Sequence, residues 1–131
     1  MSSSSDRTNL PYLTSFDHVN STLQHLKDTI VILYFTASWC GPCQRIKPFV
    51  QQLMIKYPTL KVFLIDVDNA QDASERFAIK SMPTFCIFKG RNPVFRFSGA
   101  DQEKLSMLVE VAVKAAASGE TIQQPIIRNT T

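Results

Sequence analysis

The sequence of 131 residues lacks long apolar runs and contains few cysteines. No segment approaches the ~20 consecutive apolar residues that a membrane-spanning helix needs. The opening segment, Met1 to Thr8, is rich in serine and has no apolar stretch of the kind that a secretory signal carries. We therefore expect a protein of the cytoplasm or the nucleus. In such a reducing compartment, a close pair of cysteines is catalytic or metal-binding rather than structural.

The sequence also lacks a large excess of positive or negative charge. The formal net charge is +3, and lysine and arginine are scattered rather than gathered into a stripe, so we predict no nucleic-acid partner and no membrane partner. With 44% hydrophobic and 19% charged residues, the composition is that of a globular chain, and the length suits one domain.

Hydrophobic periodicity divides the chain into a disordered lead (1–9), one domain (10–117) and a flexible tail (118–131). Within the domain, helices are predicted near 16–27, 41–56 and 70–77 and after an Asp101 cap, and strands over 30–35, 61–66, 84–88 and 94–97. The hairpin connection between the last two strands is predicted at residues 90–93. This order implies an α/β fold in which a central mixed β-sheet is flanked by helices on both faces.

The segment Trp39-Cys40-Gly41-Pro42-Cys43 lies between a predicted strand and a predicted helix. A helix N-terminus favours negative charge, so we expect the pKa of Cys40 to be lowered and its sulfur to be partly exposed. Cys43, about one helical turn further on, can reach back to Cys40. This spacing permits thiol–disulfide exchange in which Cys40 attacks a substrate disulfide and Cys43 resolves the mixed disulfide. The chemistry needs no metal and no organic cofactor.

The competing interpretation of the pair is half of a zinc site. Four ligands are usual, and only Cys86, His18 and His25 remain to complete the set. Cys86 falls within a predicted apolar strand and both histidines fall on the first predicted helix, so the redox interpretation is favoured. We expect Cys86 to be a buried core thiol.

The segment with the two cysteines resembles the active site of the thioredoxin family. The similarity extends to Phe35–Trp39 (FTASW), Phe63–Asp68 (FLIDVD), Met82–Phe85 (MPTF) and Phe97–Ala100 (FSGA), and it spans about residues 10 to 116. It implies a thioredoxin fold and a protein-disulfide reductase that serves cell redox homeostasis.

The same resemblance implies further site residues. Pro83 matches the family's cis-proline, Met82 would form part of a substrate groove, and Trp39 would offer an apolar docking surface. Gly99 and Ala100 would line the far rim. Gly41 and Pro42 would shape the turn between the cysteines.

Tyr34 departs from the family pattern, because typical thioredoxins carry a buried aspartate at this position. Tyrosine, with an ordinary pKa near ~10, is a poor proton acceptor at neutral pH. Proton transfer at Cys43 would then use water, a backbone group or the Tyr34 hydroxyl. We predict a slower or specialised reductase whose rate depends less on pH near neutrality.

The resemblance implies that electrons come from NADPH through a separate thioredoxin reductase, and the lack of a glycine-rich phosphate loop in the sequence agrees with this expectation. Other expected partners are disulfide-containing proteins. The resemblance also predicts a monomer, because Ser81 stands where some animal relatives carry a dimer-bridging cysteine. The alternative function is a partner-specific binding module whose redox activity is secondary. A disulfide isomerase is disfavoured, since Pro42 rather than histidine separates the cysteines.

Overall fold

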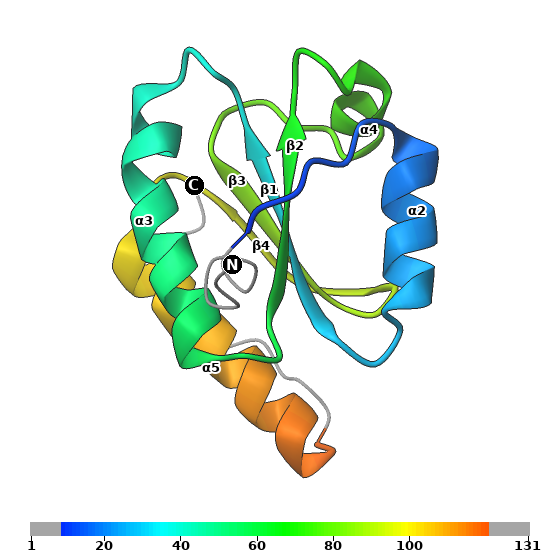
Figure 1. Ribbon diagram of the computed structural model, residues 1–131, viewed down its shortest axis with the longest axis vertical. Coiled ribbons are helices and arrows are strands. Elements are labelled where there is room, and N and C mark those ends of the chain that lie inside the picture. The colour runs from blue at the N-terminus through cyan, green and yellow to red at the C-terminus, as the bar shows by residue number, and fades with distance from the viewer. Residues whose placement is uncertain (1–8, 121–131) are drawn as a thin grey trace, which may run out of the picture.

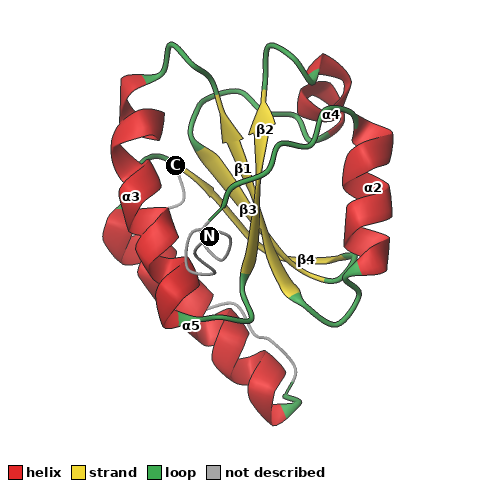
Figure 2. Cartoon of the chain, in the orientation of Figure 1, coloured by secondary structure: helices red, strands yellow, loops and turns green. Residues whose placement is uncertain are grey.

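The computed structural model describes residues 9–120, with a mixed sheet of four strands at its centre (Figures 1 and 2). The spatial order of the strands is β2-β1-β3-β4. The elements, in chain order, are α2 (Phe16–His25), β1 (Ile30–Thr36), α3 (Gly41–Lys56), β2 (Lys61–Asp66), α4 (Gln71–Arg76), β3 (Thr84–Lys89), β4 (Asn92–Ser98) and α5 (Gln102–Ser118). The predicted α/β architecture with a central mixed sheet is thus confirmed.

Strand β1 is buried along its whole length because helices cover both faces of the sheet. It runs parallel to β2 and antiparallel to β3, and β4 completes the sheet antiparallel to β3. Helices α3 and α5 lie on one side of the sheet and α2 and α4 on the other (Figure 2). A strand that is covered on both faces reads as a continuous apolar run, which explains the sequence of β1.

Strand β3 shows how the two faces of the sheet are built. Phe85 and Ile87 belong to the core under α3 and α5, whereas Cys86 and Phe88 belong to the core under α2 and α4. Successive side chains on a strand point to opposite faces, so neighbouring residues end in separate apolar clusters. This alternation places Cys86 on the face opposite to Tyr34.

The hairpin between β3 and β4 is shorter than the sequence predicts. The prediction that Asn92 and Pro93 belong to the connection is wrong, because both belong to β4 and only Gly90 and Arg91 lie between the strands. Proline is tolerated there because β4 is an edge strand. Gly90 has φ +59°, and a Cβ at this position would lie 2.1 Å from the Lys27 carbonyl oxygen, so this turn requires glycine.

The helix boundaries follow capping chemistry. The side chains of Ser15 and Asp101 accept hydrogen bonds from backbone N–H groups in the first turns of α2 and α5. Helix α3 runs through Pro48 without interruption to Lys56. Helix α5 ends at Gly119, whose φ of 75° is left-handed.

Most of the predicted lead and tail lies outside the described residues, so the domain limits stay a prediction. Within residues 9–120, no helix has both the length and the apolar character needed to cross a membrane.

Candidate active site

The two cysteines of the predicted redox pair meet at the N-terminus of α3. Cys40 is the N-cap residue, Cys43 lies in the first turn, and a disulfide joins them with a Cα–Cα distance of 5.3 Å. The backbone N–H of Cys43 donates a hydrogen bond to Cys40 Sγ at 3.2 Å. This position exposes the Cys40 sulfur to an amide donor and to the positive end of the helix dipole, and both favour a thiolate over a thiol.

The two cysteine residues differ in their access to solvent. Cys40 is 6% exposed, whereas Cys43 is 0% exposed. Ala37, Val67 and Met82 pack against the pair and form a small apolar cluster with it. An incoming disulfide therefore has a route to Cys40 alone.

Tyr34 lies directly behind Cys43. Its hydroxyl donates a hydrogen bond to the carbonyl oxygen of Cys43, and its ring packs against the Phe85 ring in a tilted arrangement, with 4.9 Å between the ring centroids. Burial raises the pKa of Tyr34 well above its usual value, and the neighbouring Tyr12 phenol raises it further. The hydroxyl is therefore a fixed donor that holds the backbone of Cys43. Of the three proton routes that the sequence left open, this geometry disfavours the Tyr34 hydroxyl.

The segment before β3 forms the other side of the site. The Met82–Pro83 peptide bond is cis, and the carbonyl oxygen of Met82 lies 3.7 Å from Cys40 Sγ. The backbone N–H of Gly99 donates to the carbonyl oxygen of Pro83 at 2.9 Å. Met82 thus lies beside Cys40, and Gly99, from a separate part of the chain, is joined to Pro83, with Ala100 exposed beside Gly99.

Trp39 stands at the edge of the site as the largest exposed apolar side chain there. It is 66% exposed, and its indole Nε1 donates a hydrogen bond to Asp68 Oδ2 at 2.9 Å. Gly41 and Pro42 are exposed in the first turn of α3. The hydrogen bond thereby orients the indole while its apolar surface stays open to solvent.

Sequence reasoning missed three residues that support the site. Gln44 Nε2 donates to the carbonyl oxygen of Ala37 at 3.1 Å and so ties the first turn of α3 to the preceding loop. Ala37 and Val67 pack on the cysteines. Their spacing gives no sign of this role, because Val67 reaches the site only through the pairing of β2 with β1.

The zinc interpretation finds no support in the arrangement of the ligands. Cys86 belongs to the core cluster under α2 and α4, apart from the cluster of Cys40 and Cys43. Among residues 9–120, no three histidine, cysteine, aspartate or glutamate side chains gather as a metal site would require.

Comparison with known proteins identifies the family. The thioredoxin family model matches residues 12–111. The chain belongs to the thioredoxin family. Thioredoxin of Ophiophagus hannah is 40% identical over 98 residues, which cover 75% of this chain and 90% of the relative. Thioredoxin of Homo sapiens is 43% identical over 86 residues, which cover 66% of this chain and 82% of the relative.

Solved structures agree with the thioredoxin assignment. The crystal structure of Fasciola hepatica thioredoxin superimposes with a TM-score of 0.74 at 31% identity, covering 77% of this chain and 97% of that chain. With the Cys40–Cys43 disulfide on the same fold, this member of the thioredoxin family is a dithiol–disulfide oxidoreductase of the protein-disulfide reductase type.

Proposed function

We propose that this chain reduces disulfides in other proteins with Cys40 as the nucleophile and Cys43 as the resolving thiol. The observation that carries the assignment is the difference in exposure within the pair, 6% against 0%. The N–H of Cys43 points at Cys40 Sγ, which supports the same order of attack.

The reaction proceeds by two exchanges. The Cys40 thiolate attacks one sulfur of the substrate disulfide, forms a mixed disulfide and expels the other substrate sulfur as a thiolate. Cys43, after losing its proton, attacks Cys40 Sγ and expels the second substrate sulfur. Two electrons pass to the substrate, and the protein is left with the Cys40–Cys43 disulfide.

A substrate segment would lie in the groove between Trp39 on one side and Gly99 and Ala100 on the other. Met82 and Pro83 form its floor beside Cys40, where backbone groups are available to an extended peptide. The exposed indole of Trp39 supplies apolar contact area.

Tyr34 makes the resolving step of this protein unusual. The aspartate expected at this position in thioredoxins is replaced by a group that donates to the Cys43 carbonyl and has a raised pKa. Tyr34 therefore positions Cys43 and takes no proton from it, which leaves water or a backbone group as the acceptor. We expect slower turnover than in an aspartate-containing thioredoxin, with a weaker dependence on pH near neutrality.

The electron donor would be a separate thioredoxin reductase that uses NADPH, and the protein would act as a monomer in the cytoplasm and the nucleus. Coupled oxidation of NADPH by a thioredoxin reductase in the presence of this protein tests the donor, and microscopy of a tagged chain tests the location.

The deciding experiment is catalysed reduction of insulin by dithiothreitol, with the wild type, Cys40→Ser and Tyr34→Asp. Wild-type activity above the dithiothreitol background, lost in Cys40→Ser, is the expected result. Tyr34→Asp should raise the rate and restore a pH dependence near neutrality; an unchanged rate and profile would contradict the role given to Tyr34. Wild-type activity no greater than background would favour the partner-specific binding module.

A further inference from the structure

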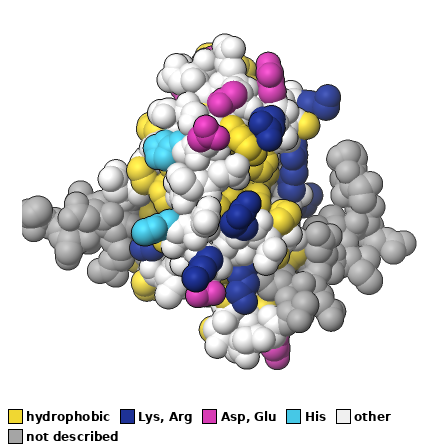
Figure 3. All heavy atoms as spheres, turned by 90° about the vertical axis from the view of Figure 1, so that its right-hand side faces the viewer, with side chains coloured by type: hydrophobic (Ala, Val, Ile, Leu, Met, Phe, Trp, Pro, Cys, Tyr) yellow, Lys and Arg dark blue, Asp and Glu magenta, His cyan; other side chains and the backbone are white. Residues whose placement is uncertain are grey.

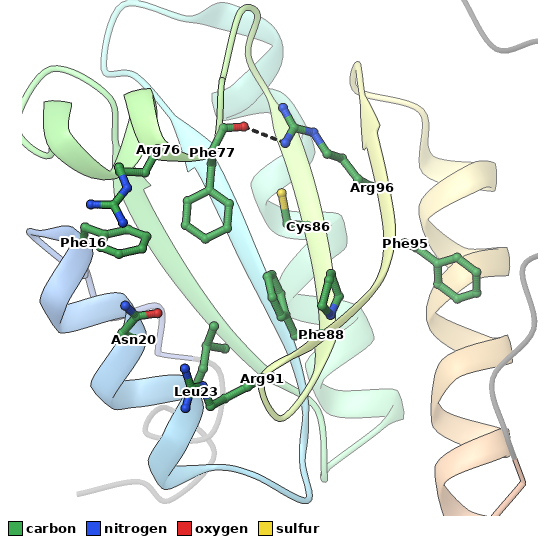
Figure 4. Close-up of a pocket in the computed structure, with 11 residues that line it drawn as sticks. Phe16, Asn20, Leu23, Arg76, Phe77, Cys86, Phe88, Arg91, Phe95 and Arg96 are labelled. Carbon is green, nitrogen blue, oxygen red and sulfur yellow. Dashed lines mark hydrogen bonds between the residues drawn. The ribbon is translucent and has the colours of Figure 1, made fainter.

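A cavity of about 450 Å³ lies on the face of the sheet opposite to the core that contains Tyr34. It is enclosed by α2, the end of α4 and the β3–β4 hairpin (Figure 4). Its apolar lining comes from Phe16, Leu23, Phe77, Cys86 and Phe88. The volume falls within the roughly 300–1,000 Å³ that small-molecule sites occupy.

The close-up shows which side chains form the cavity. Cys86 and Phe88 project from β3 toward Phe77, whereas Phe95 points away toward α5 (Figure 4). Phe95 therefore contributes backbone to the wall, and the aromatic surface comes from the other three phenylalanines. Such a surface favours a flat or branched apolar group.

The rim of this cavity is positively charged. Arg76, Arg91 and Arg96 line it, and no lining residue is acidic. Seen from the α2 side, hydrophobic side chains lie between lysine and arginine side chains (Figure 3). The positive field reaches the floor, since Arg96 acts to lower the pKa of Cys86 although burial raises it overall.

The three guanidinium groups are not equally available. Arg96 donates to the carbonyl oxygens of Phe77 and Ala78, at 2.6 and 3.0 Å. Arg76 lies 4.0 Å over the Phe16 ring, an arrangement that leaves its in-plane N–H donors open. Within residues 9–120, neither Arg76 nor Arg91 forms an ion pair. Arg76, beside Phe16, and Arg91, beside Leu23, therefore each offer a guanidinium group to an anion, at separate ends of the apolar cavity (Figure 4).

We propose that this cavity binds a small amphipathic anion, an aromatic or short acyl group that carries a carboxylate. The apolar group would occupy the space between Phe16, Phe77 and Phe88, and the carboxylate would accept charge-assisted hydrogen bonds from Arg76 at one end of the cavity or from Arg91 at the other. A free small molecule fits better than a protein segment, because the apolar lining is a single cavity between secondary-structure elements and not an extended groove. The site lies apart from the cysteine pair and adds to the proposed function without resting on it.

The test uses the full-length, disulfide-containing protein and two probes of matched shape. We would titrate 2-naphthoate and its neutral analogue 2-naphthalenemethanol and follow the backbone amide resonances by NMR. Saturable shifts are expected at Asn20, Phe77, Cys86 and Phe88, with naphthoate bound about tenfold more tightly than the alcohol. Equal affinity for the two probes, or the absence of saturable shifts at these residues, would overturn the proposal.

A pair of variants isolates the contribution of the rim. Arg76→Gln combined with Arg91→Gln should weaken naphthoate binding about tenfold and leave the alcohol unaffected. Lys56→Gln combined with Lys61→Gln removes the same charge from exposed positions outside the cavity and should leave naphthoate binding unchanged. Equal losses in the two double variants would assign the binding to net charge and contradict a built site.

A competition experiment distinguishes a free small molecule from a peptide segment that carries the same aromatic and carboxylate groups. A short peptide with glutamates on both sides of a phenylalanine carries the same groups on a protein chain. The concentration at which the peptide displaces naphthoate gives the Kd of the peptide. A Kd lower than that of naphthoate would make the cavity a peptide-docking site and overturn the small-molecule assignment. Weaker displacement by the peptide is the expected result.

Discussion

Cys43 and Cys86 are both buried, at 0% and 3% exposure, yet they occupy opposite chemical surroundings. Cys43 lies in the first turn of α3, and its carbonyl oxygen accepts from Tyr34. Cys86 lies in the middle of β3, where β1 and β4 flank it and phenylalanines pack around it. The comparison teaches that burial alone does not set the role of a thiol: Cys43 forms a disulfide with Cys40 at the N-terminus of a helix, whereas Cys86 stays a free thiol inside a sheet.

The largest difference between these two thiols should appear in catalysis. Cys43→Ser should abolish multiple-turnover insulin reduction and accumulate a mixed disulfide on Cys40, because no thiol remains to release the substrate. Cys86→Ser should keep activity within about twofold of wild type, since the side chain lies on the other face of the sheet. The measurements are insulin turbidity and intact-protein mass under non-reducing conditions. Comparable losses in the two variants would contradict the comparison.

The second difference concerns the ionisation of Cys86. Burial raises its pKa to about 11, and Arg96 opposes this only in part. Because a thiol reacts as the thiolate, its alkylation at pH 8 should be slower than that of an ordinary cysteine by about 100-fold, and the rate should keep rising up to about pH 11.

The oxidised protein offers a direct measurement, because Cys86 is then the free thiol. Iodoacetamide labelling from pH 7 to pH 11, followed by mass spectrometry, gives the profile, and the same protein unfolded in urea supplies the reference. If the pH midpoint of Cys86 alkylation were the same in the folded and the unfolded protein, burial in the sheet would not raise the pKa of this thiol.

A third prediction concerns the hydrogen bond from the Tyr34 hydroxyl to the Cys43 carbonyl oxygen, which within residues 9–120 has no counterpart at Cys86. Tyr34→Phe leaves the buried carbonyl oxygen of Cys43 without its donor and should lower the free energy of unfolding by about 1–3 kcal/mol. Urea unfolding of the oxidised protein measures this. Tyr12→Phe, at a side chain that is 50% exposed, is the matched control and should change stability little.

The smallest effect is expected at the exposed edge of the same site. Asp68→Ala removes the acceptor of the Trp39 indole, a contact open to solvent, and should raise the KM for insulin about twofold with little change in stability. Asp68→Asn keeps an acceptor oxygen and should resemble wild type. A loss of stability as large as that of Tyr34→Phe would show that the exposed contact matters as much as the buried one.

Much of the fold was predictable because its signals are local. The apolar run of β1, the strand at Lys61–Asp66 and the Asp101 cap of α5 were all located from the sequence. The end of the β3–β4 hairpin was not, since Asn92 and Pro93 look like turn residues and only the edge position of β4 admits them to a strand.

The candidate site divides in the same way. The spacing of Cys40 and Cys43 identified the reacting pair, and the resemblance to thioredoxins supplied Pro83 and Trp39. The partner of the Tyr34 hydroxyl could not be predicted, because the carbonyl of Cys43 is a backbone group whose position depends on how α3 packs on β1.

The sequence by itself determined the chemistry of this protein: two cysteines separated by Gly41 and Pro42 at the start of a helix, and the family to which they belong. The tertiary structure decided which sulfur a substrate can reach, what Tyr34 holds, and that three arginines surround an apolar cavity on the far face. These properties depend on residues that lie far apart in the chain, and only the packing of helices against both faces of the sheet brings them together.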